Sequence, residues 1–146
     1  MAEFLSFRDG EVGQEPAVTV EAFTGQTNAT AVRIEPGDDA RALLPHIDQL
    51  SLIEVNFPVY GDGRGYSAAR ILREAGYAGE LRAVGDVLVD QIVAMRRCGF
   101  DSFRPDKPLD DAAVERALGR FADVYQKTID GRQPIWARRH PEKSDG

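Results

Sequence analysis

Residues 52–85 read LIEVNFPVYGDGRGYSAARILREAGYAGELRAVG, and this stretch contains a strand, a helix and a second strand in succession. Leu52–Phe57 is an apolar run that Pro58 stops, as expected for a buried strand. The helix is indicated by apolar residues at i, i+3, i+4 and i+7, namely Ala68, Ile71, Leu72 and Ala75. Residues 80–84 are predicted to form the next strand, so the stretch is typical of a βαβ unit.

The same alternation continues on both sides of this unit. Upstream, we predict a strand at 31–35 and a helix after Asp38; downstream, a helix over 87–97 that ends at a left-handed Gly99. A last helix starts at the capping residue Asp110, with an apolar stripe that consists of Val114, Leu118, Phe121 and Tyr125. We therefore expect an α/β fold with a parallel sheet of four to five strands, near residues 31–35, 51–57, 80–85 and 99–103, and flanking helices. The sheet is either open or a partial barrel, because a complete (β/α)₈ barrel needs about 200 residues or more.

The chain divides into three parts. Residues 1–28 read as an N-terminal extension with one edge strand at Val18–Phe23, and residues 29–130 as the α/β domain. Residues 131–146 contain two prolines and no periodic apolar pattern, which predicts a mobile tail.

Composition narrows the class of protein. The chain has 146 residues and a net charge of −6, which argues against a nucleic-acid-binding protein. We expect no signal peptide and no membrane span, and therefore a cytoplasmic location. Cys98 is the single cysteine, and neither histidine has neighbours at metal-binding spacing, so no metal site is expected. The sequence identifies no cofactor and leaves homo-oligomerisation open.

Ligands of parallel α/β sheets bind beyond the carboxyl ends of the strands. At this edge the richest segment is a glycine turn, with the candidate residues Asp62, Gly63, Arg64, Gly65, Tyr66 and Ser67. Glycines allow close approach of a ligand, the helix start offers N–H groups, and an arginine adds a fixed positive charge. The turn thus predicts an anion site or a site for a phosphate-bearing cofactor. The alternative is a plain turn with Ser67 as a helix cap. The P-loop lysine is absent and the glycine spacing does not match the dinucleotide fingerprint.

Asp86 and Asp90 form a second candidate cluster, one helical turn apart and just after the third strand of the α/β domain. Carboxylates in this arrangement could bind a cation or accept a proton. The alternative is that Asp86 caps the next helix and Asp90 favours its positive end.

Arg82 is the third candidate, because it lies within a strand between Leu81 and Ala83. A buried guanidinium needs a carboxylate partner or a ligand. Glu54, Asp86 and Asp101 are the carboxylates that could pair with it, which would make Arg82 a structural residue.

The run DGRGYSAAR (62–70), with Leu72-Arg73, GYAGE (76–80), RAVGDV (82–87), Asp90-Gln91 and RCGFD (97–101), resembles a bacterial domain-of-unknown-function family. The resemblance extends over about residues 30–130. That family is commonly described as an oxidoreductase of sulfite reduction, encoded beside the sulfite reductase hemoprotein and other genes of assimilatory sulfate reduction. The resemblance carries over no catalytic residue.

Two functions compete on this basis. In the first, the protein is an accessory of assimilatory sulfite reduction that binds or assists the sulfite reductase hemoprotein, with its acidic surface against a basic patch. In the second, it is a small oxidoreductase or ligand-binding enzyme that holds a phosphate-bearing cofactor or an oxyanion at the Asp62–Ser67 loop. Whether the chain is an enzyme stays open at this point.

Overall fold

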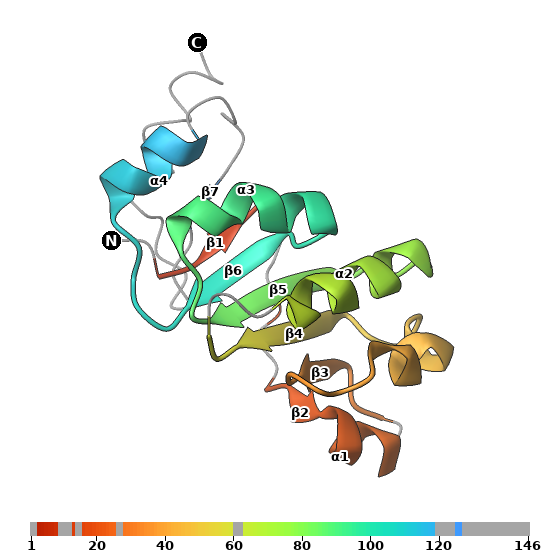
Figure 1. Ribbon diagram of the computed structural model, residues 1–146. Coiled ribbons are helices and arrows are strands. Elements are labelled where there is room, and N and C mark those ends of the chain that lie inside the picture. Colours follow the sequence, from red (N-terminus) through yellow and green to blue (C-terminus); the bar gives the residue numbers. More distant parts are fainter. Residues whose placement is uncertain are drawn as a thin grey trace.

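A computed structural model describes residues 3–8, 13, 16–25, 28–59, 63–118 and 125–126. Within these residues a single sheet has the strand order β2-β3-β4-β5-β6-β1-β7 (Figure 1). The strands are β1 (Leu5–Ser6), β2 (Val18–Thr19), β3 (Ala31–Ile34), β4 (Leu52–Phe57), β5 (Glu80–Gly85), β6 (Ser102–Pro105) and β7 (Tyr125–Gln126). The helices are α1 (Val20–Gly25), the 3₁₀ helix η1 (Ala40–His46), α2 (Arg64–Glu74), α3 (Val89–Cys98) and α4 (Asp111–Leu118).

Strands β2 to β6 are adjacent in chain order and all parallel, whereas β1 lies antiparallel between β6 and β7. The predicted α/β class with a largely parallel sheet is confirmed, and the sheet is open with more strands than expected. Because right-handed crossovers between consecutive neighbours return on the same side, the connecting helices share one face of the sheet. Contacts of α2 with η1, β4 and α3, and of α3 with α4, agree with this arrangement.

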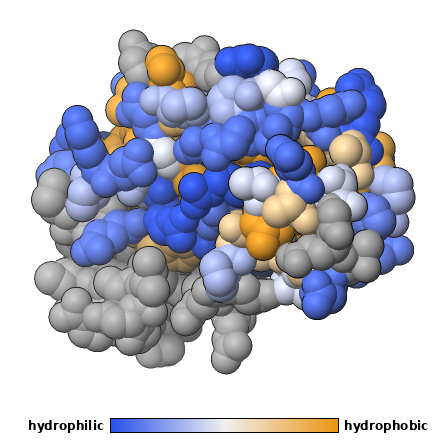
Figure 2. Space-filling model, turned by 90° about the horizontal axis from the view of Figure 1, so that it is seen from below, coloured by the Kyte–Doolittle hydropathy of each residue, from blue (hydrophilic) through white to orange (hydrophobic). Residues whose placement is uncertain are grey.

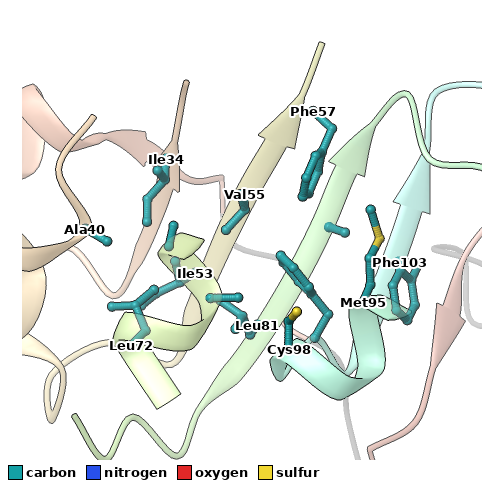
Figure 3. Close-up of a cluster of buried hydrophobic side chains, with 14 of the residues drawn as sticks. Ile34, Ala40, Ile53, Val55, Phe57, Leu72, Leu81, Met95, Cys98 and Phe103 are labelled. Carbon is teal, nitrogen blue, oxygen red and sulfur yellow. The ribbon is translucent and has the colours of Figure 1, made fainter. Parts of the chain in front are cut away.

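The hydrophobic core lies between the sheet and this helical layer. Alternate strand residues such as Ile53, Val55 and Phe57 on β4 point toward the helices, with Leu72 of α2 beside Ile53 and Met95 of α3 on the β6 side of the core (Figure 3). All five side chains are almost completely buried. The neighbouring positions on β4 and β5 face the other side of the sheet and include Glu54 and Arg82, so the two faces differ sharply in polarity. The exterior of the molecule seen in Figure 2 is mostly hydrophilic.

The expected edge strand at 18–23 is wrong beyond Thr19. Only Val18 and Thr19 pair with β3, and the chain turns into α1 at Val20. The reason is a local cap: the Thr19 hydroxyl accepts a hydrogen bond from the Ala22 amide at 3.0 Å, which favours a helix start over an extended chain.

Two further local predictions need correction. The helix after Asp38 is a 3₁₀ helix that Asp39 caps, and it contains Pro45, whose missing N–H removes one α-helical hydrogen bond. The strand expected at 99–103 begins at Ser102, because Gly99 and Phe100 close the end of α3 with backbone bonds to Arg96 and Met95. Gly99 has φ +116°, as predicted for a left-handed helix end.

The two ends of the chain contribute strands that periodicity did not predict. Leu5 and Ser6 pair with Phe103 and Ser102 on one side and with β7 on the other, so β1 is not an edge strand. Tyr125 belongs to β7 and not to the last helix, which is described over Asp111–Leu118, and Phe121 of the predicted stripe lies outside the described residues. The expected cap of this helix is confirmed, because Asp110 accepts a bond from the Ala113 amide at 2.9 Å. The predicted tail, 131–146, lies outside the described residues.

Candidate functional site

The glycine turn and Asp86 follow the paired carboxyl ends of β4 and β5. Phe57 and Gly85 are partners in the two strands, and the Asp86 amide donates to the Phe57 carbonyl at 2.6 Å. Gly85 has φ +96°, which lets β5 end there and turn toward α3. The backbone therefore places the start of α2 and Asp86 beyond the carboxyl ends of β4 and β5, as predicted.

Gly65 has a packing role. It is buried in the first turn of α2, and a Cβ there would overlap the Phe57 ring and lie 3.1 Å from Val55 Cγ1. Tyr66 packs edge-on against the same ring, with a centroid separation of 5.7 Å. The close approach that this glycine permits is thus between α2 and β4, and not between the loop and a ligand.

The other loop residues lie at the surface. Gly63 precedes α2 and nothing lies within 4 Å of the position where its Cβ would be. Arg64 and Ser67 are exposed, and α2 has no side-chain cap, so Ser67 does not cap it. Asp62 lies outside the described residues. The start of α2 therefore remains accessible.

Of the two candidate carboxylates Asp86 and Asp90, only Asp90 lies within α3. Helix α3 begins at Val89, and its N-cap is Leu88, whose amide donates a hydrogen bond to Gln91 Oε1 at 3.1 Å. The expectation that Asp86 caps α3 is therefore wrong. Asp90 is exposed in the first turn of α3, as predicted.

An open depression of about 420 Å³ lies at this carboxyl edge, where β5 and β6 lead toward α3 and α4. Its charged lining residues are Asp86, Asp106, Asp110 and Lys107. Two negative charges therefore remain in excess, and this depression does not suit an anion. Among the described residues no group of three or more His, Cys, Asp or Glu is arranged to hold a metal ion.

Arg82 lies away from this edge, on the face of the sheet opposite the described helices. It is 3% exposed and contacts Glu54 Oε2 at 3.2 Å and Glu80 Oε2 at 2.8 Å. It also donates to the Gly13 carbonyl at 2.7 Å, and Phe4 stacks on its guanidinium at 4.9 Å. Of the three carboxylates considered from the sequence, Glu54 is the partner, and the structural interpretation of Arg82 is the one observed.

Glu80 is held ionised by this environment. Burial alone would raise its pKa, but hydrogen bonds from Ser102 and the Gly13 amide, together with the charge of Arg82, outweigh burial and lower the pKa below its usual range. The Ser102 hydroxyl donates to Glu80 Oε2 at 2.7 Å. No sequence pattern indicates the role of Gly13, because its contact with Glu80 spans 67 residues.

A second network of ion pairs and hydrogen bonds, centred on Asp101, lies at the amino ends of β5 and β6. Asp101 accepts from Arg8 at 2.7 Å, from Arg73 at 3.1 Å and from the Leu81 amide at 2.8 Å. Arg73 also donates to the carbonyls of Tyr77, Gly79 and Gly99, each at 2.9 Å. Arg73 and Asp101 belong to the stretch that carries the family resemblance, and both hold backbone in place.

The fold and these networks define a class of α/β protein with helices on one face of its parallel strands and a polar, ion-paired opposite face. Residues 31–136 match DUF934, a family of bacterial proteins of unknown function, and the chain belongs to that family. No curated protein and no solved structure matches the chain. In the described parts of the chain, no helix has the length and apolar character needed to cross a bilayer.

Proposed function

We propose that the protein is an accessory of assimilatory sulfite reduction that binds the sulfite reductase hemoprotein through the carboxyl edge of its sheet. The observation that supports a binding role is the surface at this edge. Val59 and Leu88, the large hydrophobic side chains exposed among the described residues, follow the adjacent strands β4 and β5. Exposed apolar side chains beside a charged rim are typical of a protein-binding surface.

The charge of this surface supports a basic partner. Asp86, Asp106 and Asp110 line the depression beside Leu88, and the whole chain carries a net charge of −6. Opposite charges across an interface increase the association rate and favour one orientation of the partners. The sulfite reductase hemoprotein enters the proposal through the family resemblance of residues 62–101.

A non-catalytic role is supported by the structural contacts of the residues that carry the family resemblance. Gly65 packs α2 on β4, Arg73 and Asp101 fix backbone, and Arg82 is buried between two carboxylates. The alternative is an enzyme with a phosphate-bearing cofactor at residues 62–67. It is supported by the accessible start of α2. However, Gly65 packs against Phe57, so this glycine does not provide the close approach to a ligand on which the alternative relied.

The direct test is gel filtration or calorimetry of the purified protein with the hemoprotein. We expect a complex that weakens as the salt concentration rises. Asp106→Lys should weaken this complex, whereas Asp48→Lys, an exposed acidic residue between η1 and β4, should not. Equal binding by the two variants, or no complex with the wild-type protein, would contradict the proposal. Deletion of the gene should impair growth on sulfate and spare growth on cysteine.

A further inference from the structure

On the face of the sheet opposite the described helices, three arginine side chains converge on one carboxylate. Arg33, Glu54 and Arg82 are direct neighbours across β3, β4 and β5, and they therefore point to the same side of the sheet. Arg104 on β6 reaches the same carboxylate from two strands away. We call Arg33, Arg82 and Arg104 the arginine cluster.

The distances show that Glu54 is shared by all three. Its Oε1 accepts from Arg33 Nε at 3.1 Å and from Arg33 Nη2 at 2.9 Å. Its Oε2 lies 3.2 Å from Arg82 Nη1 and 3.1 Å from Arg104 Nη2. Glu80 adds a second carboxylate on Arg82. These five side chains carry three positive and two negative charges, and Glu35 adds a third negative charge at the carboxyl end of the same face.

The members of the cluster differ in their access to solvent. Arg82 and Glu54 are each 3% exposed, and all the contacts of Arg82 described above lie inside the protein. The side chains of Arg33 and Arg104 are 37% and 33% exposed. Within the described residues, the polar contacts of Arg33 and Arg104 both go to Glu54, through Nε and Nη2 of Arg33 and through Nη2 alone of Arg104. The remaining N–H groups of these two side chains contact no other described residue.

From this arrangement we infer a binding site for a small oxyanion between Arg33 and Arg104, above the buried carboxylate of Glu54. Guanidinium groups bind carboxylate, phosphate and sulfate-like oxygens through pairs of parallel N–H groups. Since Glu54 holds both guanidinium groups in place, their remaining N–H groups are already oriented and little side-chain entropy is lost on binding.

Glu35 limits the size of the ligand. It follows β3 at the carboxyl edge and accepts a hydrogen bond from Asn56 Nδ2 at 2.7 Å. A carboxylate at this end of the face repels a second negative group, so a single compact oxyanion fits better than a long polyanion. This site is separate from the surface proposed to bind the hemoprotein, and the two proposals can fail independently.

The test is calorimetric titration of the full chain with inorganic sulfate and inorganic phosphate, in chloride buffer of constant ionic strength. We expect Arg104→Ala to weaken the binding of the better anion by about tenfold or more, since it removes charge-assisted hydrogen bonds. Arg104→Lys, which keeps the charge but loses the fork, should bind with intermediate affinity. Arg70→Ala, at an exposed arginine of α2, should bind like the wild-type protein.

Circular dichroism establishes that each variant is folded, and NMR locates the anion. On titration, the Nε–H signals of Arg33 and Arg104 should shift. No anion binding by the wild-type protein, or unchanged affinity in a folded Arg104→Ala variant, would overturn the inference. A shift confined to the amides at the start of α2 would also overturn it and would place the anion at residues 63–67 instead.

Discussion

At the scale of single residues, Gly65 and Gly63 are a matched pair. Both stand at the start of α2, but a Cβ on Gly65 would overlap the Phe57 ring, whereas a Cβ on Gly63 would meet open space. We expect Gly65→Ala to lower the free energy of unfolding by about 1–3 kcal/mol, because α2 would have to move away from β4. Gly63→Ala should change it by less than about 1 kcal/mol. Urea denaturation of the two variants measures the difference, and equal stabilities would contradict this account of Gly65.

The lowered pKa of Glu80 predicts a pH dependence of stability. The ordinary pKa of this carboxyl is 4.5, and its folded-state pKa is lower. Its ionised form therefore stabilises the protein at pH values above 4.5, and this contribution is lost as the pH falls through the folded-state value. Glu80→Gln should be less stable than the wild-type protein at neutral pH, and the gap should narrow on acidification. Glu74→Gln, at an exposed position on α2, supplies the control in pH-dependent urea denaturation.

Predictions about single residues were confirmed where the two residues are neighbours on paired strands. Glu54 was among the three carboxylates that the sequence offered to Arg82, and the two residues are cross-strand neighbours. The role of Gly65 could not be read from the sequence, since it depends on how closely α2 docks on Phe57. The contact of Gly13 with Glu80 was equally hidden, because no local pattern links residues 67 positions apart.

At the scale of elements, β1 is short but pairs with a neighbouring strand on each side. Leu5 is completely buried and belongs to the core between sheet and helices. Leu5→Ala should lower the free energy of unfolding by about 2–5 kcal/mol, because it removes a packed side chain from the strand that joins β6 to β7. Val59→Ala, at a side chain that is 61% exposed, should have little effect. Similar melting temperatures for the two variants would show that β1 is dispensable.

Elements with a continuous apolar pattern were predictable, and elements of two residues were not. Strands β3, β4 and β5 lie within one residue of their predicted ends, because each is a buried run bounded by proline, glycine or a turn. Strands β1, β2 and β7 have two residues each, which is too short for a period-2 pattern. Their existence depends on pairing with distant segments. The predicted strand ended early at Thr19 for the same reason, since a single hydroxyl cap decided between strand and helix.

At the scale of the whole molecule, stability should decrease from the centre of the sheet outward. Strands β4 and β5 pair along six residues and have neighbours on both sides, whereas β2 pairs through two residues at one edge. We expect the amides of β4 and β5 to exchange with solvent most slowly and those of β2 much faster. Hydrogen exchange measured by NMR tests this order, and slower exchange in β2 than in β4 would contradict it.

The position of β1 has a consequence for the growing chain on the ribosome. Strands β2 to β6 lie side by side in the order in which they are synthesised, so each can join the sheet soon after it emerges. Leu5 and Ser6 are made before β2 to β6, yet their partners Ser102 and Phe103 are made about a hundred residues later. Strand β1 therefore leaves the ribosome before β2 to β6 but can join the sheet only after them, and the newly made β6 presents an open edge to other chains until β1 pairs with it.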